Sequence, residues 1–417
     1  MSALLFILIF LTLSFGGEKV HSVVLDNGVR LIIKQTHGKG IVAGVIFIKS
    51  GVHGESKKGI TNLITTLLTK GTKKYSSYDI ASAFEDYGGS ISANTTDDYV
   101  EIAFATKVEG LQRGLEVIRS MLYEPAFNEE DISREKTNII SAIRSKRERG
   151  YELAMEHLRT LTFKGTDYEV SPLGKEEDIK SITKDDLINR WKDLLKGGSV
   201  VVSIVGDIQP EKVETMIKPL FLEMPIGAFD IGKKDVYIQT SQLQKVKRPG
   251  AQTTLLCAFN APKIEDKDYY SFKVLVSALG NGMTSKLFKE LREKKGYAYA
   301  TYAYYPTRLL SPRMFAYVGT SPEKSQSALE DLIKVVQSSE LTQEDVKLAK
   351  SKLVGDFLLD HQTRLKQAWY LGFYEIMGLG WKMDELYPEK VESVSYQEVL
   401  EVQKKYLDKH QCVVVEP

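Results

Sequence analysis

Residues 280–299 read GNGMTSKLFKELREKKGYAY and place a turn, a helix and a strand in close succession. The Gly280-Asn281-Gly282 run predicts a turn, and the residues from Ser285 to Glu293 predict a helix. Gly296 allows a sharp reversal of the backbone. From Tyr297 to Tyr305, aromatic and smaller residues then alternate in part, as they do in a strand. The segment therefore predicts a helix that turns directly into a strand.

The same order of predicted elements occurs in both halves of the chain. The first half opens on two strand-like runs joined by Asp26-Asn27-Gly28, a strong hairpin signal, and closes on a buried strand at residues 199–205. The second half opens on a strand at 251–259, carries another at 313–319 and closes on one at 411–415. Paired helices separate the strands. The pattern predicts an α+β fold of two homologous lobes, each a mostly antiparallel sheet with helices packed on one face.

Local signals set the boundaries of these parts. Three helices begin with a capping box, in which a Ser or Thr is followed three residues later by an acid: Ser76-Ser77-Tyr78-Asp79, Thr183-Lys184-Asp185-Asp186 and Thr342 to Asp345. The Pro- and Gly-containing run after Met224 is the best linker. We expect four segments, which are a signal peptide at 1–17, an N-terminal lobe at 18–224, a linker at 225–235 and a C-terminal lobe at 236–417.

The N-terminal segment predicts export. Ala3 to Phe15 form an apolar run, ALLFILIFLTLSF, followed by Gly16-Gly17. The run is short for a membrane span and has the length of a signal-peptide core. We expect cleavage near Gly16 or Gly17 and a periplasmic protein whose mature chain has no integral membrane segment. An uncleaved anchor is the alternative.

Composition narrows the classes of function. The chain has 417 residues, 43% of them hydrophobic, which is enough to bury more than one core. A net charge of +1 gives no electrostatic case for binding nucleic acid. The two cysteines, Cys257 and Cys412, lie in apolar, strand-like runs. They are expected to be buried, either as free thiols or, in an oxidising compartment, as a disulfide.

Residues 59–72, GITNLITTLLTKGT, predict an amphipathic helix with an unusual polar pattern. Asn62 and Thr66 lie four residues apart, so they share one helical face. Histidines at this spacing bind zinc, whereas amide and hydroxyl oxygens are poor zinc ligands. Thr65 cannot take a proton from water near neutral pH. No histidine lies four residues from another anywhere in the chain (His21, His37, His53, His157, His361 and His410).

These segments resemble the pitrilysin/insulinase-type metallopeptidases, the inverzincins, over nearly the whole mature chain. That family typically reads G-L-A-H-F-L-E-H-M-L-F-K-G-T where this chain has residues 59–72. Asn62 and Thr66 stand at its two histidine positions and Thr65 at its glutamate. The third ligand belongs to a segment like R-E-K-x-V-V-L-E-E-I, which here is REKTNIISAI, with Ser141 and Ala142 at the acidic pair. The resemblance implies that this chain itself binds no zinc.

The same resemblance implies that the other half of the site is retained. Residues 280–299 match the family run G-x-G-M-S-S-R-L-F-x-x-L-R-E-K-x-G-L-A-Y almost throughout. Its arginine and tyrosine, here Arg292 and Tyr299, bind the substrate backbone and help to stabilise the oxyanion. Residues 87–93, YGGSISA, resemble the family's G-G-x-x-N-A run, beside which an extended peptide binds. Ser92 and Ala93 are the corresponding substrate-binding positions, with Ser92 replacing the usual asparagine.

A chain that has lost one half-site and kept the other resembles the non-zinc subunit of the family's paired processing proteases. We therefore expect a heterodimer in which a zinc-bearing homologous subunit cleaves an unfolded or extended peptide. This chain would be inactive alone and would supply Arg292 and Tyr299 to the shared site. A non-catalytic scaffold and a chamber that encloses peptides without cutting them are the alternatives.

Overall fold

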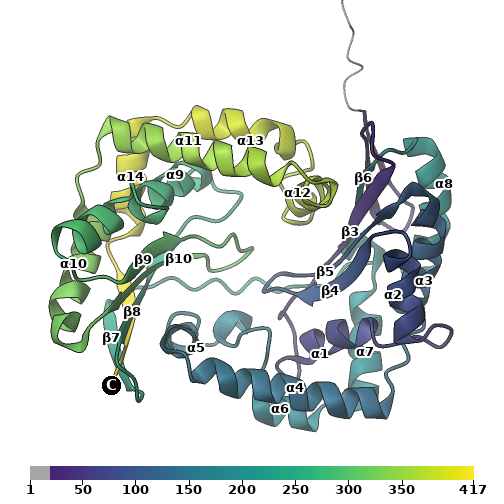
Figure 1. Cartoon of the computed structure of the whole chain (residues 1–417), viewed down its shortest axis with the longest axis horizontal. Helices are drawn as coiled ribbons and strands as arrows, with labels where there is room; N and C mark the ends of the chain where they lie inside the picture. Colours follow the sequence, from purple (N-terminus) through teal and green to yellow (C-terminus); the bar gives the residue numbers. More distant parts are fainter. Residues whose placement is uncertain (1–18) are drawn as a thin grey trace, which may run out of the picture.

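A computed structural model describes residues 19–417, which form two lobes, each built on one β-sheet (Figure 1). The expected signal peptide lies outside the described residues. The first sheet contains β1 (Val20–Val24), β2 (Arg30–Gln35), β3 (Ile41–Lys49), β4 (Ser90–Thr95), β5 (Tyr99–Lys107) and β6 (Val200–Gly206). The second contains β7 (Gln242–Lys247), β8 (Thr253–Asn260), β9 (Ala300–Tyr304), β10 (Arg313–Thr320) and β11 (His410–Glu416).

Helices fill the connections between these strands. Those of the first half are α1 (Ile60–Leu68), α2 (Ser77–Glu85), α3 (Leu111–Tyr123), α4 (Glu129–Arg147), α5 (Gly150–Thr162), α6 (Glu176–Ser181), α7 (Lys184–Leu194) and α8 (Pro210–Phe221), with short 3-10 turns η1 (Val108–Gly110), η2 (Asp167–Glu169) and η3 (Gly197–Ser199). Those of the second half are α9 (Tyr269–Gly280), the π-helix η4 (Phe288–Lys294), the 3-10 turn η5 (Pro322–Lys324), α10 (Ser325–Ser338), α11 (Gln343–Asp360), α12 (Arg364–Ile376), α13 (Met383–Glu392) and α14 (Tyr396–Tyr406).

The two sheets have the same topology, which confirms the predicted internal repeat. The first has the order β1-β2-β6-β3-β5-β4 and the second β7-β11-β8-β10-β9. Apart from the extra strand β1, each sheet uses its strands in the order first, fifth, second, fourth, third. In both, the first and fifth strands are parallel and all other neighbours are antiparallel. By this correspondence β4 and β9 are equivalent, and both are edge strands.

Each sheet is covered on both faces, because the two halves exchange helices. Helices α2, α3 and α8 pack on one face of the first sheet, while α12 of the second half packs against β3 and β6 on the other. In return, α5 of the first half packs against β8 and β11. Figure 1 shows α12 and α5 between the two lobes. The prediction of helices on one face is therefore correct for each half by itself, but it missed this exchange.

The exchanged helices lie very close to the sheets they cover. A Cβ atom at Gly372 of α12 would lie 2.5 Å from the Phe47 ring and 2.6 Å from the Ser203 hydroxyl, so only glycine fits there. That hydroxyl donates a hydrogen bond of 2.6 Å to the carbonyl of Ala368. Burial on both faces explains why strands β3 and β6 are apolar almost without interruption rather than alternating.

A buried ionic network joins the lobes at the turn between β4 and β5. The Asp97 carboxylate accepts hydrogen bonds of 2.7 Å from Arg159 on α5 and of 2.7 and 3.0 Å from Arg308 in the second half. Burial alone would raise the pKa of Asp97, but the two guanidinium charges hold it well below its usual range. Next to it, Asp98 accepts hydrogen bonds from the Tyr168 hydroxyl and, at 3.2 Å, from the backbone N–H of Leu309.

His53 completes this network from the other side. Its Nε2 lies 2.9 Å from Asp98 Oδ1, and its Nδ1 lies 3.8 Å from Asp167 Oδ2. Burial alone would lower the pKa of His53, but the hydrogen bonds and negative charges of Asp167 and Asp98 raise it to about 9. The histidine is therefore a buried cation between two carboxylates at neutral pH.

Most local predictions are confirmed, and the differences lie near η4. The capping boxes at Ser76, Thr183 and Thr342 all form. The helix expected at 285–293 is instead π-helical over Phe288–Lys294, and the strand expected from Tyr297 begins only at Ala300. The reason is that the chain from Gly296 to Ala298 folds back onto the end of η4 before it joins the sheet.

Residues 225–235, all of which the structure describes, form neither helix nor strand. The end of this connector is nevertheless held against the second lobe by contacts of Asp235. Asp235 forms an ion pair with Lys263 and accepts a 2.7 Å hydrogen bond from the Ser311 backbone. None of the helices within residues 19–417 has the length and apolarity needed to cross a bilayer.

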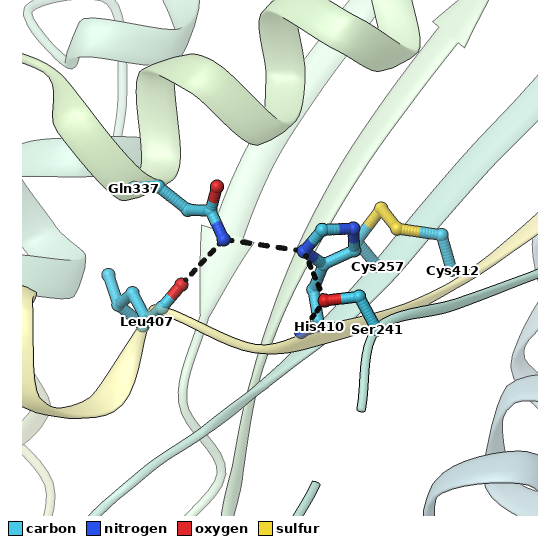
Figure 2. The surroundings of a disulfide bond; sticks show 6 residues. All are labelled: Ser241, Cys257, Gln337, Leu407, His410 and Cys412. Carbon is cyan, nitrogen blue, oxygen red and sulfur yellow. Dashed lines mark hydrogen bonds between the residues drawn. A yellow bond between two sulfur atoms is a disulfide. The ribbon is translucent and has the colours of Figure 1, made fainter. Parts of the chain in front are cut away.

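The two cysteines form a buried disulfide between neighbouring strands. Cys257 on β8 lies directly opposite Cys412 on β11, and both side chains are almost completely buried. Figure 2 shows the bond beside His410, whose Nδ1 lies 3.3 Å from both the Gln337 amide nitrogen and the Ser241 hydroxyl. The sequence left pairing open, because the distance between two remote strands is set only by the sheet.

We expect the disulfide to contribute strongly to stability, because it joins residues 155 positions apart. Closing so long a loop in the unfolded chain favours folding by about 2–5 kcal/mol. The double variant Cys257→Ala/Cys412→Ala should lose this amount in equilibrium urea unfolding. Reductant should lower the midpoint of the wild-type protein and leave that of the double variant unchanged. Equal midpoints for oxidised and reduced wild type would contradict a structural role.

We also expect His53 to make stability depend on pH. Its pKa is higher in the folded protein, about 9, than in the unfolded chain, about 6.5. The stabilisation is therefore complete below about pH 6.5 and disappears as pH rises through about 9, with a change of up to about 3 kcal/mol. The difference in unfolding free energy between wild type and His53→Gln should shrink over this range. The exposed His37→Gln provides the control, and a constant difference would refute the assignment.

Candidate functional site

The N-terminus of α1 is capped by a buried glutamate that the sequence did not single out. Glu55 accepts hydrogen bonds of 3.0 Å from the backbone of Gly59 and 2.9 Å from that of Thr61. Burial raises the pKa of Glu55, and the two backbone hydrogen bonds oppose that rise. Arg190 donates to the Thr61 hydroxyl and, at 2.7 Å, to the His53 carbonyl. The helix is thus held in place by polar contacts at its first turn.

The two threonines among the three polar positions of α1 direct their hydroxyls to the backbone of their own helix. The Thr65 and Thr66 hydroxyls both donate to the Asn62 carbonyl, at 3.0 and 2.9 Å. Thr65 is buried, and its hydroxyl also lies 3.0 Å from that of Thr95 on β4. Both hydroxyls bind the backbone of α1, and that of Thr65 also links α1 to the sheet. Neutral hydroxyls engaged in such contacts are poor ligands for zinc.

The remaining position of the degenerate metal site lies on the neighbouring helix. Helix α4 packs against α1, and its Glu135 carboxylate lies 3.2 Å from the Lys70 ammonium beyond the end of α1. Ser141 lies two turns further along α4 and is exposed. Within residues 19–417, no three His, Cys, Asp or Glu side chains form a group that could hold a metal ion.

Ser92 and Ala93 lie on β4, one edge of the first sheet. They pair with Ala103 and Ile102 of β5, and the opposite side of β4 has no strand partner within the described chain. Ser92 is exposed and Ala93 is partly buried. An exposed strand edge offers free backbone N–H and C=O groups to an extended peptide. Both residues therefore lie on a strand that has a sheet neighbour on one side only within residues 19–417.

The retained motif is built around η4, a turn of π-helix. Such wide turns are rare and occur frequently at functional sites. The Leu291 carbonyl accepts from the backbone of Tyr297 at 2.8 Å and of Ala298 at 3.3 Å. Gly296, with a φ of 59°, makes the reversal possible. The loop that carries Tyr299 is thereby fixed against the end of the helix that carries Arg292.

Both side chains of the predicted pair are exposed. Arg292 stacks over the Phe288 ring at 5.1 Å and makes no ion pair or side-chain hydrogen bond with residues 19–417. Tyr299 is 58% exposed and is held by its backbone N–H, which donates to the Gly319 carbonyl at 2.9 Å. It directly precedes β9, so the expectation that it lies on this strand was wrong by one residue. Both side chains are available to a molecule outside the chain.

The two half-sites are not joined within one chain. Helix α1 with Asn62, Thr65 and Thr66 belongs to the first lobe, and β9, which Tyr299 directly precedes, belongs to the second (Figure 1). The internal repeat nevertheless relates them, since each lies beside the free edge strand of its own sheet, β4 or β9.

Comparisons with known proteins give one family for both halves. The model for Insulinase (Peptidase family M16) matches residues 30–175, and the model for the Peptidase M16 inactive domain matches residues 181–353.

Individual relatives extend these matches over most of the chain. A Helicobacter pylori protein named non-peptidase homolog YmxG is 22% identical over 83% of this chain and 81% of its own. A second protein of that organism, named zinc protease PqqE, is 23% identical over 82% and 80%. A solved peptidase M16 inactive domain from Pseudomonas fluorescens has a TM-score of 0.89, with 19% identity, covering 95% of this chain and 98% of that one. This last similarity concerns the fold.

The exposure of the pair predicts that it is not needed for folding. We expect Arg292→Ala and Tyr299→Phe to change the free energy of unfolding by less than about 0.5 kcal/mol, as at other surface positions. Leu291→Ala, in the same motif but fully buried, should cost about 2–5 kcal/mol. Urea unfolding of the three variants measures this. A loss of stability at Arg292 or Tyr299 comparable to that at Leu291 would mean that the pair is structural.

Proposed function

Because this chain belongs to the M16 (insulinase) peptidase family, we propose that it is the non-zinc subunit of a heterodimeric zinc peptidase. A zinc-bearing homologue would supply the metal and the general base, for which α1 of this chain offers no suitable side chains. This chain would supply Arg292 and Tyr299 for substrate binding and oxyanion stabilisation. Its substrate would be an unfolded or extended peptide.

The observation that carries the proposal is the contrast between the two half-sites. On α1 the hydroxyls of Thr65 and Thr66 are engaged in contacts within the protein. On the retained motif, the Arg292 guanidinium and the Tyr299 phenol have no hydrogen-bond acceptor among the described residues. Free donors on a rigid loop suit a negative charge that develops on a carbonyl oxygen.

The relatives support a division of labour. Helicobacter pylori has both a relative named as a non-peptidase homolog and one named as a zinc protease. Each alignment covers about four-fifths of the length of this chain. Two such proteins in one organism are what a split enzyme requires. We propose that the organism of this chain likewise has a zinc-bearing counterpart.

The edge strand β4 supports peptide binding in an extended conformation. An added strand would pair with the free backbone beside Ser92 and Ala93. The serine at position 92 offers a hydroxyl where the family usually has an amide. We propose that this edge contributes backbone contacts, while the side chain at position 92 contributes little specificity.

Export of the chain is also part of the proposal. The apolar run at residues 3–15 supports it, and so does the buried disulfide, because such bonds persist mainly in oxidising compartments such as the periplasm. We propose that the mature protein works there. Cell fractionation of a tagged full-length chain would test this, and recovery in the cytoplasm with reduced cysteines would contradict it.

Peptidase activity in a mixture of the two proteins tests the proposed function. An unstructured peptide is incubated with this chain, with a zinc-bearing homologue from the same organism, and with both. We expect cleavage only in the mixture, abolished by a chelator, while the isolated chain retains no stoichiometric zinc. Arg292→Ala should lower kcat/KM about 100- to 1,000-fold, as loss of an oxyanion donor does, and Tyr299→Phe should also lower it strongly.

A matched control separates this effect from general disturbance of the motif. Lys294→Ala removes an exposed cation from the same helix and should leave activity unchanged. Among residues 19–417, Lys294 forms an ion pair only with Glu290, at 2.7 Å. Full activity of the homologue alone, or no gain on mixing, would overturn the split-enzyme proposal. A stable complex without cleavage would then favour a scaffold or a peptide-binding chamber.

A further inference from the structure

A cavity of about 480 Å³ lies where the two lobes meet. Its walls include the turn from Thr96 to Tyr99 in the first lobe and residues of α9, α11, α12 and α13 in the second. Eight of its lining side chains are aromatic, among them Tyr269, Trp369 and Tyr374. This volume lies within the range of about 300–1,000 Å³ that is typical of small-molecule sites.

Lys273 of α9 brings an unpaired positive charge into this cavity. Its Nζ lies 5.2 Å from the centre of the Tyr269 ring, and it forms no ion pair with any residue of 19–417. The side chain is partly buried and also lines a neighbouring cavity of about 240 Å³. A cation that is removed from water without a counter-charge is costly, so this position favours an anionic ligand.

Two phenols add further unused donors to the lining of this cavity. Tyr374 and Tyr387 are 3% and 6% exposed, and their hydroxyls make no hydrogen bond with the described residues. Their rings lie 6.5 Å apart. Burial raises the pKa of Tyr387, and the nearby positive charge of Lys273 opposes that rise. The Lys273 ammonium has Tyr269 as a neighbour but no counter-charge among the described residues, and the two neutral phenols have no acceptor there.

The acidic side chains of the cavity are already paired. Asp97 is held by Arg159 and Arg308, and Asp98 by His53 and Tyr168. Asp356 lies 3.5 Å from the Lys352 ammonium, and Asp360 accepts a 2.9 Å hydrogen bond from Tyr370 and lies 3.8 Å from Lys366. Asp356 and Asp360 are about half exposed, which places them at the mouth. Neither provides a partner for Lys273.

From these contacts we propose that the cavity binds a monocarboxylate with an apolar or aromatic body. The carboxylate would accept hydrogen bonds from Lys273, Tyr374 and Tyr387, since a carboxylate is an acceptor-only group. The aromatic walls would bury the body. A cationic ligand would add a second positive charge beside Lys273. The carboxylate could belong to a small organic acid or to the C-terminus of an apolar peptide, and the site is independent of pairing with a second subunit.

Matched acids and amides test the proposal by isothermal titration calorimetry on the full chain. The probes are 3-phenylpropionate and its amide for the small acid, and N-acetyl-Ala-Phe and its C-terminal amide for the peptide. We expect at least one acid to bind about 10-fold or more tightly than its amide. The acid that binds identifies the source. Equal affinity of acid and amide in both pairs, or no binding of either acid at about 10 mM, would overturn the proposal.

Variants locate the binding within the cavity. Lys273→Met preserves most of the side-chain volume and should weaken the acid about 10- to 100-fold while leaving the amide unchanged. Lys347→Met removes an exposed lysine of α11 outside the cavity and should change neither. Tyr374→Phe should weaken the acid about 2- to 10-fold and serves as the test if Lys273→Met does not fold. Acid binding unaffected by both cavity variants would refute the site.

Discussion

The Asp97 carboxylate, held by Arg159 and Arg308, is the contact on which the arrangement of the two lobes depends. Arg159 comes from the exchanged helix α5 and Arg308 from the second half, so one carboxylate fixes the turn after β4 to both. Removing one partner of such a buried cluster leaves a charge unpaired, which costs more than the contact itself contributes. The same turn connects the edge strand β4 with β5 and lines the inter-lobe cavity. The position of the edge strand β4 and the walls of the cavity therefore follow from the same contact.

The internal repeat explains how a half-site can be lost without loss of the fold. Helix α1 follows the second strand of its sheet, as α9 does in the other lobe, and both support an edge strand. In α1 the positions of the missing ligands contribute hydrogen bonds to the helix and to β4, which preserve that support. In the second lobe the Arg292 guanidinium lies over the Phe288 ring, and neither it nor the Tyr299 phenol makes a side-chain hydrogen bond or ion pair with the described residues.

Much of the fold could be predicted from local patterns in the sequence. The capping boxes at Ser76, Thr183 and Thr342 act within four residues, and the central strands are apolar because both of their faces are buried. The π-helical turn of η4 could not be predicted, since it depends on backbone groups from Leu291 to Ala298 meeting after a reversal. Glu55 gave no signal, because a buried capping carboxylate looks like any surface acid in the sequence. Lys273 was missed because the cavity around it forms only when distant helices meet.

The exchange of α5 and α12 has a consequence for the ancestry of the chain. Each sheet would expose a whole apolar face if its half were cut away from the other, because the helix that covers that face is encoded in the opposite half. A precursor of half the length could have buried the same surface only by association with a second copy and reciprocal donation of a helix, as in a domain-swapped dimer. Gene duplication and fusion would then have converted an association between molecules into one within a single chain. Once fused, the two copies were free to diverge in sequence.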